Sequence, residues 1–357
     1  WVSICTAYST GFVGCAEYSR LRVVDKENGG TKADPVNAGL NVAKYPYFIN
    51  TDVDCILSEN AIKMCIRPMI EEENVIAVSG VMNISNACEV HEGKLVKYRI
   101  PWSPIPLFQT LEYLRSFMIG KMGWSKINAM PNVSGGYGMF DTELAIKAGG
   151  YSFDSLAEDM DMLIRMIGYC CDFGRKYKVE QIPYTCCWTE GPPNLKMLHR
   201  QRTRWGHGLI QTFGKYHHIM FKKKYRQLGL ITLPYLFIFE FLAPLIECVG
   251  FCMFIYLAFT GGVNWNTAWL IFLAIYFFCF QLSFIVIYYD YLHTRMRGYS
   301  YVRLIVAALL EPFIYHPLIV LFSILGYFKF IMGKGIVWGE MKRKGFKQEE
   351  EETKPTS

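Results

Sequence analysis

The sequence lacks the cysteine spacings of a zinc site or of a disulfide framework. Its 357 residues contain twelve cysteines, but no two of them are separated by two residues, and two pairs are adjacent. No signal-peptide pattern opens the sequence, which begins Trp1-Val2-Ser3. We therefore expect free thiols, and we expect the chain to be an N-terminally truncated product.

Charge is missing from part of the chain as well. Residues 267–289 contain no charged side chain, and residues 228–259 and 304–328 are almost as apolar. Each of these runs reaches the ~20 residues that a helix needs to cross a bilayer. Hydrophobic residues make up 52% of the chain, which is high for a soluble protein. The pattern excludes an ordinary soluble domain and predicts a C-terminal transmembrane region.

The net charge of +6 could indicate a nucleic-acid binder, but the positions of the basic residues argue against it. They gather beside the apolar runs: Lys222, Lys223, Lys224 and Arg226 before the first, and Arg295, Arg297 and Arg303 before the third. Cytoplasmic flanks of membrane spans are enriched in this way. We expect an integral protein of the plasma (inner) membrane with a cytoplasmic catalytic domain and no nucleic-acid partner. The number of spans and the side of the C-terminus stay open.

Four ionisable residues fall inside the apolar runs: Glu240, Glu247, Glu311 and His316. Facing lipid would cost several kcal/mol, so such side chains usually face a cavity or another part of the protein. The sequence leaves both alternatives open.

The first part of the chain alternates between strand and helix patterns. We expect strands at 20–25, 47–49 and 75–78, and helices at 32–43, 58–71, 109–123, 141–148 and 158–167. This alternation predicts an α/β sandwich with a mostly parallel sheet. A further helix at 194–214 carries apolar and basic faces, so it would lie along a membrane surface or dock beneath the membrane helices.

Two carboxylates, Asp52 and Asp54, follow the predicted strand at 47–49. Two residues apart at a strand end, they would project on one side. Oxygen ligands suit Mg²⁺ or Mn²⁺, which would neutralise a diphosphate. The alternative is a polar strand end or a cap for the next helix.

A second acidic pair, Glu158 and Asp159, opens a predicted helix. Carboxylates are favoured there by the helix dipole alone. The functional alternative makes Asp159 a general base that removes a proton from an attacking hydroxyl.

Three residues of the helix at 194–214 share one face, because Gln201, Arg204 and Trp205 lie at i, i+3 and i+4. Arg204 could hold a diphosphate through two parallel hydrogen bonds, and Trp205 offers a flat surface for a sugar ring. The alternative is a Trp anchor at the membrane interface.

A glycine-rich turn at 28–34 leads into a helix. Such turns let the backbone approach a phosphate or a base. Lys32 would add positive charge near a nucleotide, and Asp34 would form a hydrogen bond with it.

In combination, these motifs resemble those of the processive family 2 glycosyltransferases, which include cellulose, hyaluronan, chitin and poly-N-acetylglucosamine synthases. The matching segments are 28–34, 51–54, 134–140, 157–159 and 201–205, and the run 338–343 is most similar to the poly-N-acetylglucosamine type. The resemblance implies a GT-A fold, a UDP-sugar donor and inversion at the anomeric carbon. It also implies secretion of the polymer through the same protein.

The resemblance assigns roles to individual residues. It implies a catalytic pair (Asp159 as the base, Glu158), a donor site (Lys32, Asp34, Asp52, Asp54, Arg204), a metal site (Asp52, Asp54) and an acceptor site (Gly135, Gly136, Gln201, Trp205). The chain departs from the family in three respects. It has no counterpart of the first strand with its uracil-binding aspartate, no N-terminal membrane helices, and Ala157 in place of the usual threonine.

We therefore expect a GT-A catalytic domain apparently lacking its N-terminal part (1–193), amphipathic interfacial helices (194–227), a transmembrane region (228–332) and a tail that is basic and then acidic (333–357). The expected reaction joins UDP-GlcNAc or UDP-Glc units into a β-linked polysaccharide, with Mg²⁺ or Mn²⁺ as the cofactor. The partners are the UDP-sugar donor, the growing polysaccharide, the lipid bilayer and, as an open alternative, an accessory membrane subunit. Two other functions stay open: a non-processive enzyme that adds one sugar to a lipid, or a membrane scaffold derived from a decayed enzyme.

Overall fold

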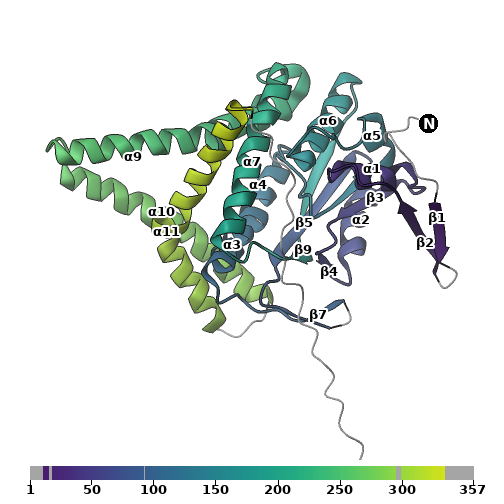
Figure 1. Ribbon diagram of the computed structural model, residues 1–357, viewed down its shortest axis with the longest axis horizontal. Coiled ribbons are helices and arrows are strands. Elements are labelled where there is room, and N and C mark those ends of the chain that lie inside the picture. Colours follow the sequence, from purple (N-terminus) through teal and green to yellow (C-terminus); the bar gives the residue numbers. More distant parts are fainter. Residues whose placement is uncertain (1–10, 16–17, 92, 295–298, 334–357) are drawn as a thin grey trace, which may run out of the picture.

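The structure is a computed structural model that describes residues 11–15, 18–91, 93–294 and 299–333. They form an α/β domain followed by long apolar helices, which stand on one side of the domain in Figure 1, opposite strands β1 and β2. The α/β class and the apolar C-terminal region are therefore confirmed. Arg295, Arg297 and the tail, including the run 338–343, lie outside the described residues.

The central sheet of the described part has five strands in the order β3, β8, β5, β9, β4. Their bounds are Tyr47–Thr51 (β3), Ile56–Leu57 (β4), Val75–Ile84 (β5), Tyr137–Asp141 (β8) and Lys178–Thr189 (β9). Two hairpins lie outside the sheet: β1 (Gly11–Cys15) with β2 (Tyr18–Asp25), and β6 (Glu89–His91) with β7 (Lys94–Lys97).

The prediction of a mostly parallel sheet is wrong. Among the described strands only β5 and β9 pair in parallel, while β3 with β8, β8 with β5, and β4 with β9 are antiparallel. The alternation of strand and helix correctly implied that β3 and β5 run in one direction. However, β8 comes from much later in the chain and inserts between them, and local patterns do not report such an insertion.

The helices of the α/β domain agree with the predicted segments to within a few residues. They are α1 (Ala33–Asn41), α2 (Ala61–Glu71), α3 (Pro104–Arg115), α4 (Lys121–Lys126), α5 (Thr142–Lys147), α6 (Glu158–Asp172) and α7 (Leu195–Tyr216). The segment predicted as one helix at 109–123 begins earlier, at Pro104, and a π-helical stretch, Ser116–Gly120, separates α3 from α4. Proline suits a first turn because its missing N–H would have no partner there.

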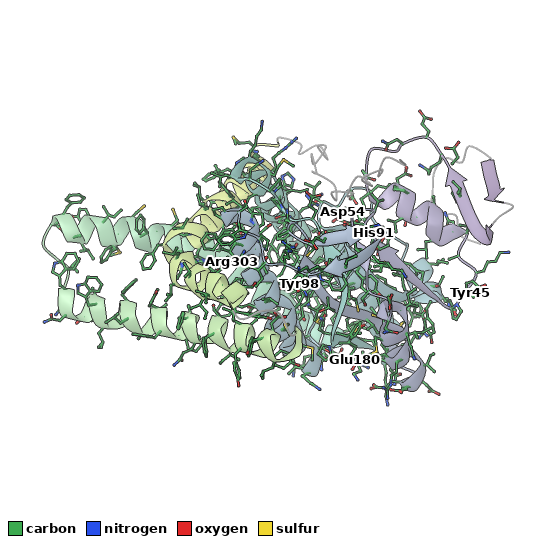
Figure 2. All side chains as sticks on the ribbon, turned by 90° about the horizontal axis from the view of Figure 1, so that it is seen from below. Tyr45, Asp54, His91, Tyr98, Glu180 and Arg303 are labelled. Atoms are coloured by element: carbon green, nitrogen blue, oxygen red, sulfur yellow. The ribbon has the colours of Figure 1, made fainter. Side chains whose placement is uncertain are left out.

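The three predicted apolar stretches are confirmed as helices. In the described residues, three helical segments are long and apolar enough to cross a membrane: Leu228–Phe259, Trp265–Leu292 and Ser300–Ile331. The first contains two π-helical stretches, Leu228–Thr232 and Leu236–Leu242, around α8 (Leu233–Tyr235), and continues as α9 (Ala243–Phe259). The others are α10 (Trp265–Thr294) and α11 (Tyr299–Ile331), and short 3₁₀ turns at His217–Ile219 and Lys223–Tyr225 precede them. Figures 1 and 2 both show α9 and α10 projecting away from the α/β domain.

Helix α7 packs closely against α11. A Cβ atom at Gly206 of α7 would lie 2.7 Å from the backbone oxygen of Ser323 in α11, and one at Gly326 would overlap the backbone oxygen of Thr203. Glycine at both positions lets the two backbones touch, as small residues do where membrane helices cross. Of the two alternatives for this segment, the structure favours docking against the apolar helices.

Three of the four ionisable residues within the apolar helices, Glu247, Glu311 and His316, have partners from a different element. Glu311 of α11 forms an ion pair with Arg115 of α3, in which Nη1 and Oε2 are 2.5 Å apart. His316 Nε2 lies 2.7 Å from Glu247 Oε2 of α9. For Glu311 the structure therefore favours a contact with the catalytic domain over a cavity.

Candidate active site

The two aspartates of the first motif lie in the turn after β3 rather than in the strand itself. The Asp52 amide donates to the Gly136 carbonyl (3.2 Å), which continues the pairing of β3 with β8. Asp52 Oδ1 is 2.6 Å from Lys32 Nζ, whereas Asp54 Oδ2 accepts a hydrogen bond from Thr189 (3.3 Å) at the end of β9. The two carboxylates thus contact different neighbours. Since they lie in a turn, the alternation of side chains along a strand, from which we expected them to project on one side, does not apply. Figure 2 places Asp54 in the α/β domain.

Lys32 lies at the centre of this cluster. Its ammonium group donates to the Gly135 carbonyl (2.8 Å) and lies 2.6 Å from Asp52 and 3.4 Å from Glu158. Burial by itself works to lower the pKa of Lys32, but the charges of Asp52 and Glu158 outweigh it and raise this pKa above the ordinary value. The lysine is therefore a fixed positive charge surrounded by oxygen atoms.

The acidic pair at the start of α6 joins the cluster, and its two members differ in accessibility. Glu158 is only 5% exposed, and burial, followed by the neighbouring charge of Asp159, raises its pKa. Asp159 is half-buried, and its Oδ2 accepts from the Asn132 amide (2.9 Å) and from the Gly135 amide (3.2 Å). The accessible and firmly oriented carboxylate is that of Asp159.

The two glycines assigned to the acceptor site lie within this carboxylate cluster. Gly135 links Lys32 to Asp159, since its carbonyl accepts from Lys32 and its amide donates to Asp159. Gly136 is buried, and a Cβ atom there would lie 2.6 Å from Met82. Side chains therefore pack closely around the chain at both glycines.

Asp34, predicted to bind the donor, is held within its own loop. It is 5% exposed, accepts from the Gly29 amide (3.0 Å) and forms an ion pair with Lys26. A Cβ atom at Gly29 would overlap the Asp34 carboxylate. These contacts give Asp34 a role in shaping the glycine-rich turn.

Helix α7 lies against the segment that leads into α6. Arg204 Nη1 donates to the Leu156 carbonyl (3.3 Å), and a Cβ atom at Gly208 would lie 3.0 Å from Ala157. The charge of Arg204 also acts to lower the pKa of Glu158. The structure thus brings the cationic residue of the third motif to the edge of the carboxylate cluster.

Gln201 and Trp205 are held by residues that the sequence analysis did not identify. Gln201 is buried and accepts from Gln109 of α3 (3.1 Å), while Arg202 lies over the Trp205 ring, 4.3 Å from its centroid. Trp205 remains 39% exposed. Gln109 is the first residue of the helix predicted at 109–123, and nothing in the sequence marks it as a partner of Gln201.

Asn132 and Lys121 were missed as well. Asn132 donates to Asp159 from a loop without a motif. Lys121 of α4 is 7% exposed, and burial lowers its pKa to about 8 against the opposing effect of Asp159. Its ammonium lies over the Phe117 ring, 4.6 Å from the centroid. No local pattern marks either residue.

The described residues contain no group of three or more His, Cys, Asp or Glu side chains arranged to hold a metal ion. A cation at Asp52 and Asp54 would therefore need further ligands from a substrate.

The fold has a counterpart among solved structures. It resembles the structure of a mannosyltransferase from Pyrobaculum calidifontis in complex with GDP-Man and Mn²⁺, with a TM-score of 0.50 and 17% sequence identity over 88% of this chain and 70% of that one. The α/β domain therefore has the GT-A-like fold of glycosyltransferases, followed by apolar helices.

The sequence then identifies the family. The model described as "Glycosyl transferase family group 2" matches residues 107–289, just over half of the chain, and the model "Glycosyl transferase family 2" matches residues 2–121. The chain belongs to glycosyltransferase family 2.

Among curated proteins, the chain is similar to poly-beta-1,6-N-acetyl-D-glucosamine synthases. It is 25% identical to the protein of Staphylococcus aureus (strain COL) over 185 residues, which is 52% of this chain. It is 26% identical to the protein of Staphylococcus epidermidis over 188 residues, which is 53% of this chain. The matches span 40% and 41% of the lengths of these relatives.

Proposed function

We propose that this membrane-associated glycosyltransferase builds a β-linked polysaccharide from a UDP-sugar and passes the product toward its apolar helices. The observation that carries the proposal is the position of α7. This helix packs against α11 on one side and places Arg204 at the edge of the carboxylate cluster on the other. An acceptor held on α7 would therefore lie between the reacting centre and the membrane. The similarity to poly-beta-1,6-N-acetyl-D-glucosamine synthases favours UDP-GlcNAc over UDP-Glc as the donor.

In this proposal Asp159 is the general base. It takes the proton from the acceptor hydroxyl as that oxygen attacks the anomeric carbon and the nucleoside diphosphate leaves. Asn132 and Gly135 hold the carboxylate in a fixed orientation. Buried Glu158 contributes negative charge beside Lys32.

Asp52 and Asp54 would be the protein ligands of a hard divalent cation, Mg²⁺ or Mn²⁺. Both lie in the turn after β3, where Asp52 contacts Lys32 and Asp54 contacts Thr189, so an ion would have to draw the two carboxylates together. Such cations are commonly held by one or two carboxylates together with substrate phosphates. When bound, the ion would neutralise the diphosphate of the donor.

Lys32, at the centre of the cluster, and Arg204, at its edge, supply positive charge. Arg204 can hold a diphosphate oxygen pair because its guanidinium presents parallel donors. Trp205, exposed on the same helix, offers a ring face to the acceptor sugar, and Gln201 lies one turn before it.

The proposal is tested by incubating membranes that contain the full chain with radiolabelled UDP-GlcNAc or UDP-Glc. Long polymer that only a β-specific hydrolase degrades supports it and identifies the sugar. A single-sugar lipid product would indicate the non-processive alternative, and no incorporation from either donor would contradict the proposal.

Trp205→Ala is expected to shorten or abolish the polymer while UDP release by donor hydrolysis changes less. Stacking on an aromatic face holds a sugar without fixing its register, and its loss should raise the acceptor KM roughly tenfold. Product length and UDP release, measured on the same membranes, give the result. Trp205→Phe is the matched control, because it keeps a flat ring. Polymer of normal length from the alanine variant would leave Trp205 as an interfacial anchor.

The catalytic domain is expected on the cytoplasmic side. The exposed basic residues Lys222, Lys223, Lys224 and Arg226 directly precede the first apolar segment, where positive charge is retained on the cytoplasmic face. In sealed right-side-out vesicles, external trypsin should leave this cluster uncut, and it should cut it after permeabilisation. Cleavage before permeabilisation would place the domain outside and contradict the topology.

A further inference from the structure

Helix α3 carries a row of polar residues that faces other helices instead of solvent. Gln109, Glu112 and Arg115 are spaced three residues apart, so they follow one side of the helix. Gln109 is fully buried, and the other two are partly buried in contacts with α7, α10 and α11. Figure 1 shows α3 beside the lower end of α7.

The two ends of the row contact different helices: α7 at one end, and the apolar helices α10 and α11 at the other. Gln109 donates to Gln201 of α7 (3.1 Å). Arg115 Nη1 donates to Ser283 of α10 (2.7 Å) and to Glu311 of α11 (2.5 Å). The first contact thus lies beside the acceptor residues, and the last lies within the apolar helices.

The middle member makes the most extensive contact. Glu112 accepts two parallel hydrogen bonds from Arg202 of α7 (2.7 and 2.6 Å) and a third from the Tyr315 hydroxyl of α11 (2.8 Å). Arg202 also donates to the Tyr315 hydroxyl (3.3 Å). One carboxylate therefore joins three helices, and the paired geometry fixes the plane of the Arg202 guanidinium.

The guanidinium of Arg202 also contacts the Trp205 ring. Arg202 and Trp205 are one turn apart on α7, and the guanidinium carbon lies 4.3 Å from the ring centroid. Arg202 is 5% exposed, whereas Trp205 is 39% exposed. The buried guanidinium therefore packs against the ring while much of the ring stays accessible. A cation held in this way attracts the ring.

We propose that Arg202 and Glu112 are positioning residues that hold Trp205 in the orientation that receives an acceptor sugar, with Tyr315 tying this orientation to α11. The inference rests on the proposed role of Trp205 as the acceptor platform. It assigns to Arg202 a role different from that of Arg204, since Arg202 acts through Trp205 and touches no substrate.

The test compares Arg202→Lys, Glu112→Gln and Tyr315→Phe in the purified full chain. Lysine keeps the charge but cannot form two parallel hydrogen bonds or lie flat on a ring. Tyr315→Phe removes one hydroxyl while keeping the ring that stacks on Phe108 at 5.2 Å, so it should fold even where the others do not. Arg67→Gln is the matched control, because it breaks an exposed ion pair on α2.

Calorimetric titration with a β-linked GlcNAc pentamer and, separately, with UDP gives the first readout. The expected result is a Kd for the pentamer raised about tenfold in Arg202→Lys and Glu112→Gln and severalfold in Tyr315→Phe, with the Kd for UDP unchanged. Arg67→Gln should match the unmodified chain. Equal weakening of UDP and pentamer binding would indicate a general structural role and would overturn the proposal.

A second readout does not depend on the proposed function. It is the quenching of tryptophan fluorescence by acrylamide. The contribution of Trp205 is obtained by subtracting the quenching measured for the same chain carrying Trp205→Phe. It should increase in Arg202→Lys and Glu112→Gln, since the ring loses its support. An unchanged contribution would overturn the positioning role. Failure of the unmodified chain to bind the pentamer, together with increased quenching in the variants, would instead contradict the acceptor role of Trp205 and leave the positioning intact.

Discussion

Asp159→Asn is expected to lower the rate of sugar transfer by a factor on the order of 10²–10⁴, the usual contribution of a positioned general base. Asparagine keeps the shape of the side chain and an oxygen that can accept from Asn132 and Gly135, but it cannot take up the proton. UDP binding should be nearly unchanged, because the base acts in the transition state. Transfer from UDP-GlcNAc and the Kd for UDP, measured on the same preparation, check this.

Asp172→Asn is the matched control, because Asp172 ends the same helix and pairs with Lys224 at the surface. It should behave like the unmodified chain. If Asp159→Asn weakened UDP binding as much as it slowed transfer, Asp159 would bind the donor or support the fold, and the base would have to be sought elsewhere.

Asp52→Asn and Asp54→Asn are each expected to reduce transfer on the order of 10³-fold, and EDTA should do the same to the unmodified chain. The charge stabilisation that a divalent ion supplies is several kcal/mol, and each 1.36 kcal/mol is a factor of ten in rate. Asp52→Asn also removes the carboxylate that lies closest to Lys32. The measurement is the dependence of the transfer rate on added Mn²⁺ or Mg²⁺.

The control for this pair is Glu59→Gln, an exposed carboxylate shortly after the same turn, 3.9 Å from Lys94. It should respond to Mn²⁺ as the unmodified chain does. Full activity in EDTA would contradict the metal role, and Lys32 and Arg204 would then be the cations proposed to offset the charge of the diphosphate.

Local patterns in the sequence predicted most of the helices but only three of the described strands, β2, β3 and β5, and not how the elements meet. The helix at Glu158, the strand before Asp52 and the three apolar helices follow from periodicity and from residue types over short stretches. The insertion of β8 between β3 and β5 depends on pairing between distant segments, so it was mispredicted.

The same limit applies to the candidate site. Asp52, Asp159 and Arg204 stand in short motifs that the sequence displays, and the structure brings the first two to Lys32 or Gly135. Asn132 lies in no motif, and the contact of Gln109 with Gln201 joins residues 92 positions apart. Such contacts arise only when helices pack, so a single sequence carries no direct sign of them.

The crossing at Gly206 and Gly326 bears on how α7 and α11 can move against each other. Because the backbones of α7 and α11 approach each other closely at these two glycines, we expect the two helices to move together. In the proposed mechanism, translocation therefore requires the glycan to step past a stationary Trp205 instead of being carried by a moving α7. In each step Trp205 would release one sugar ring and bind the next. The glycan would then advance by the length of one sugar unit.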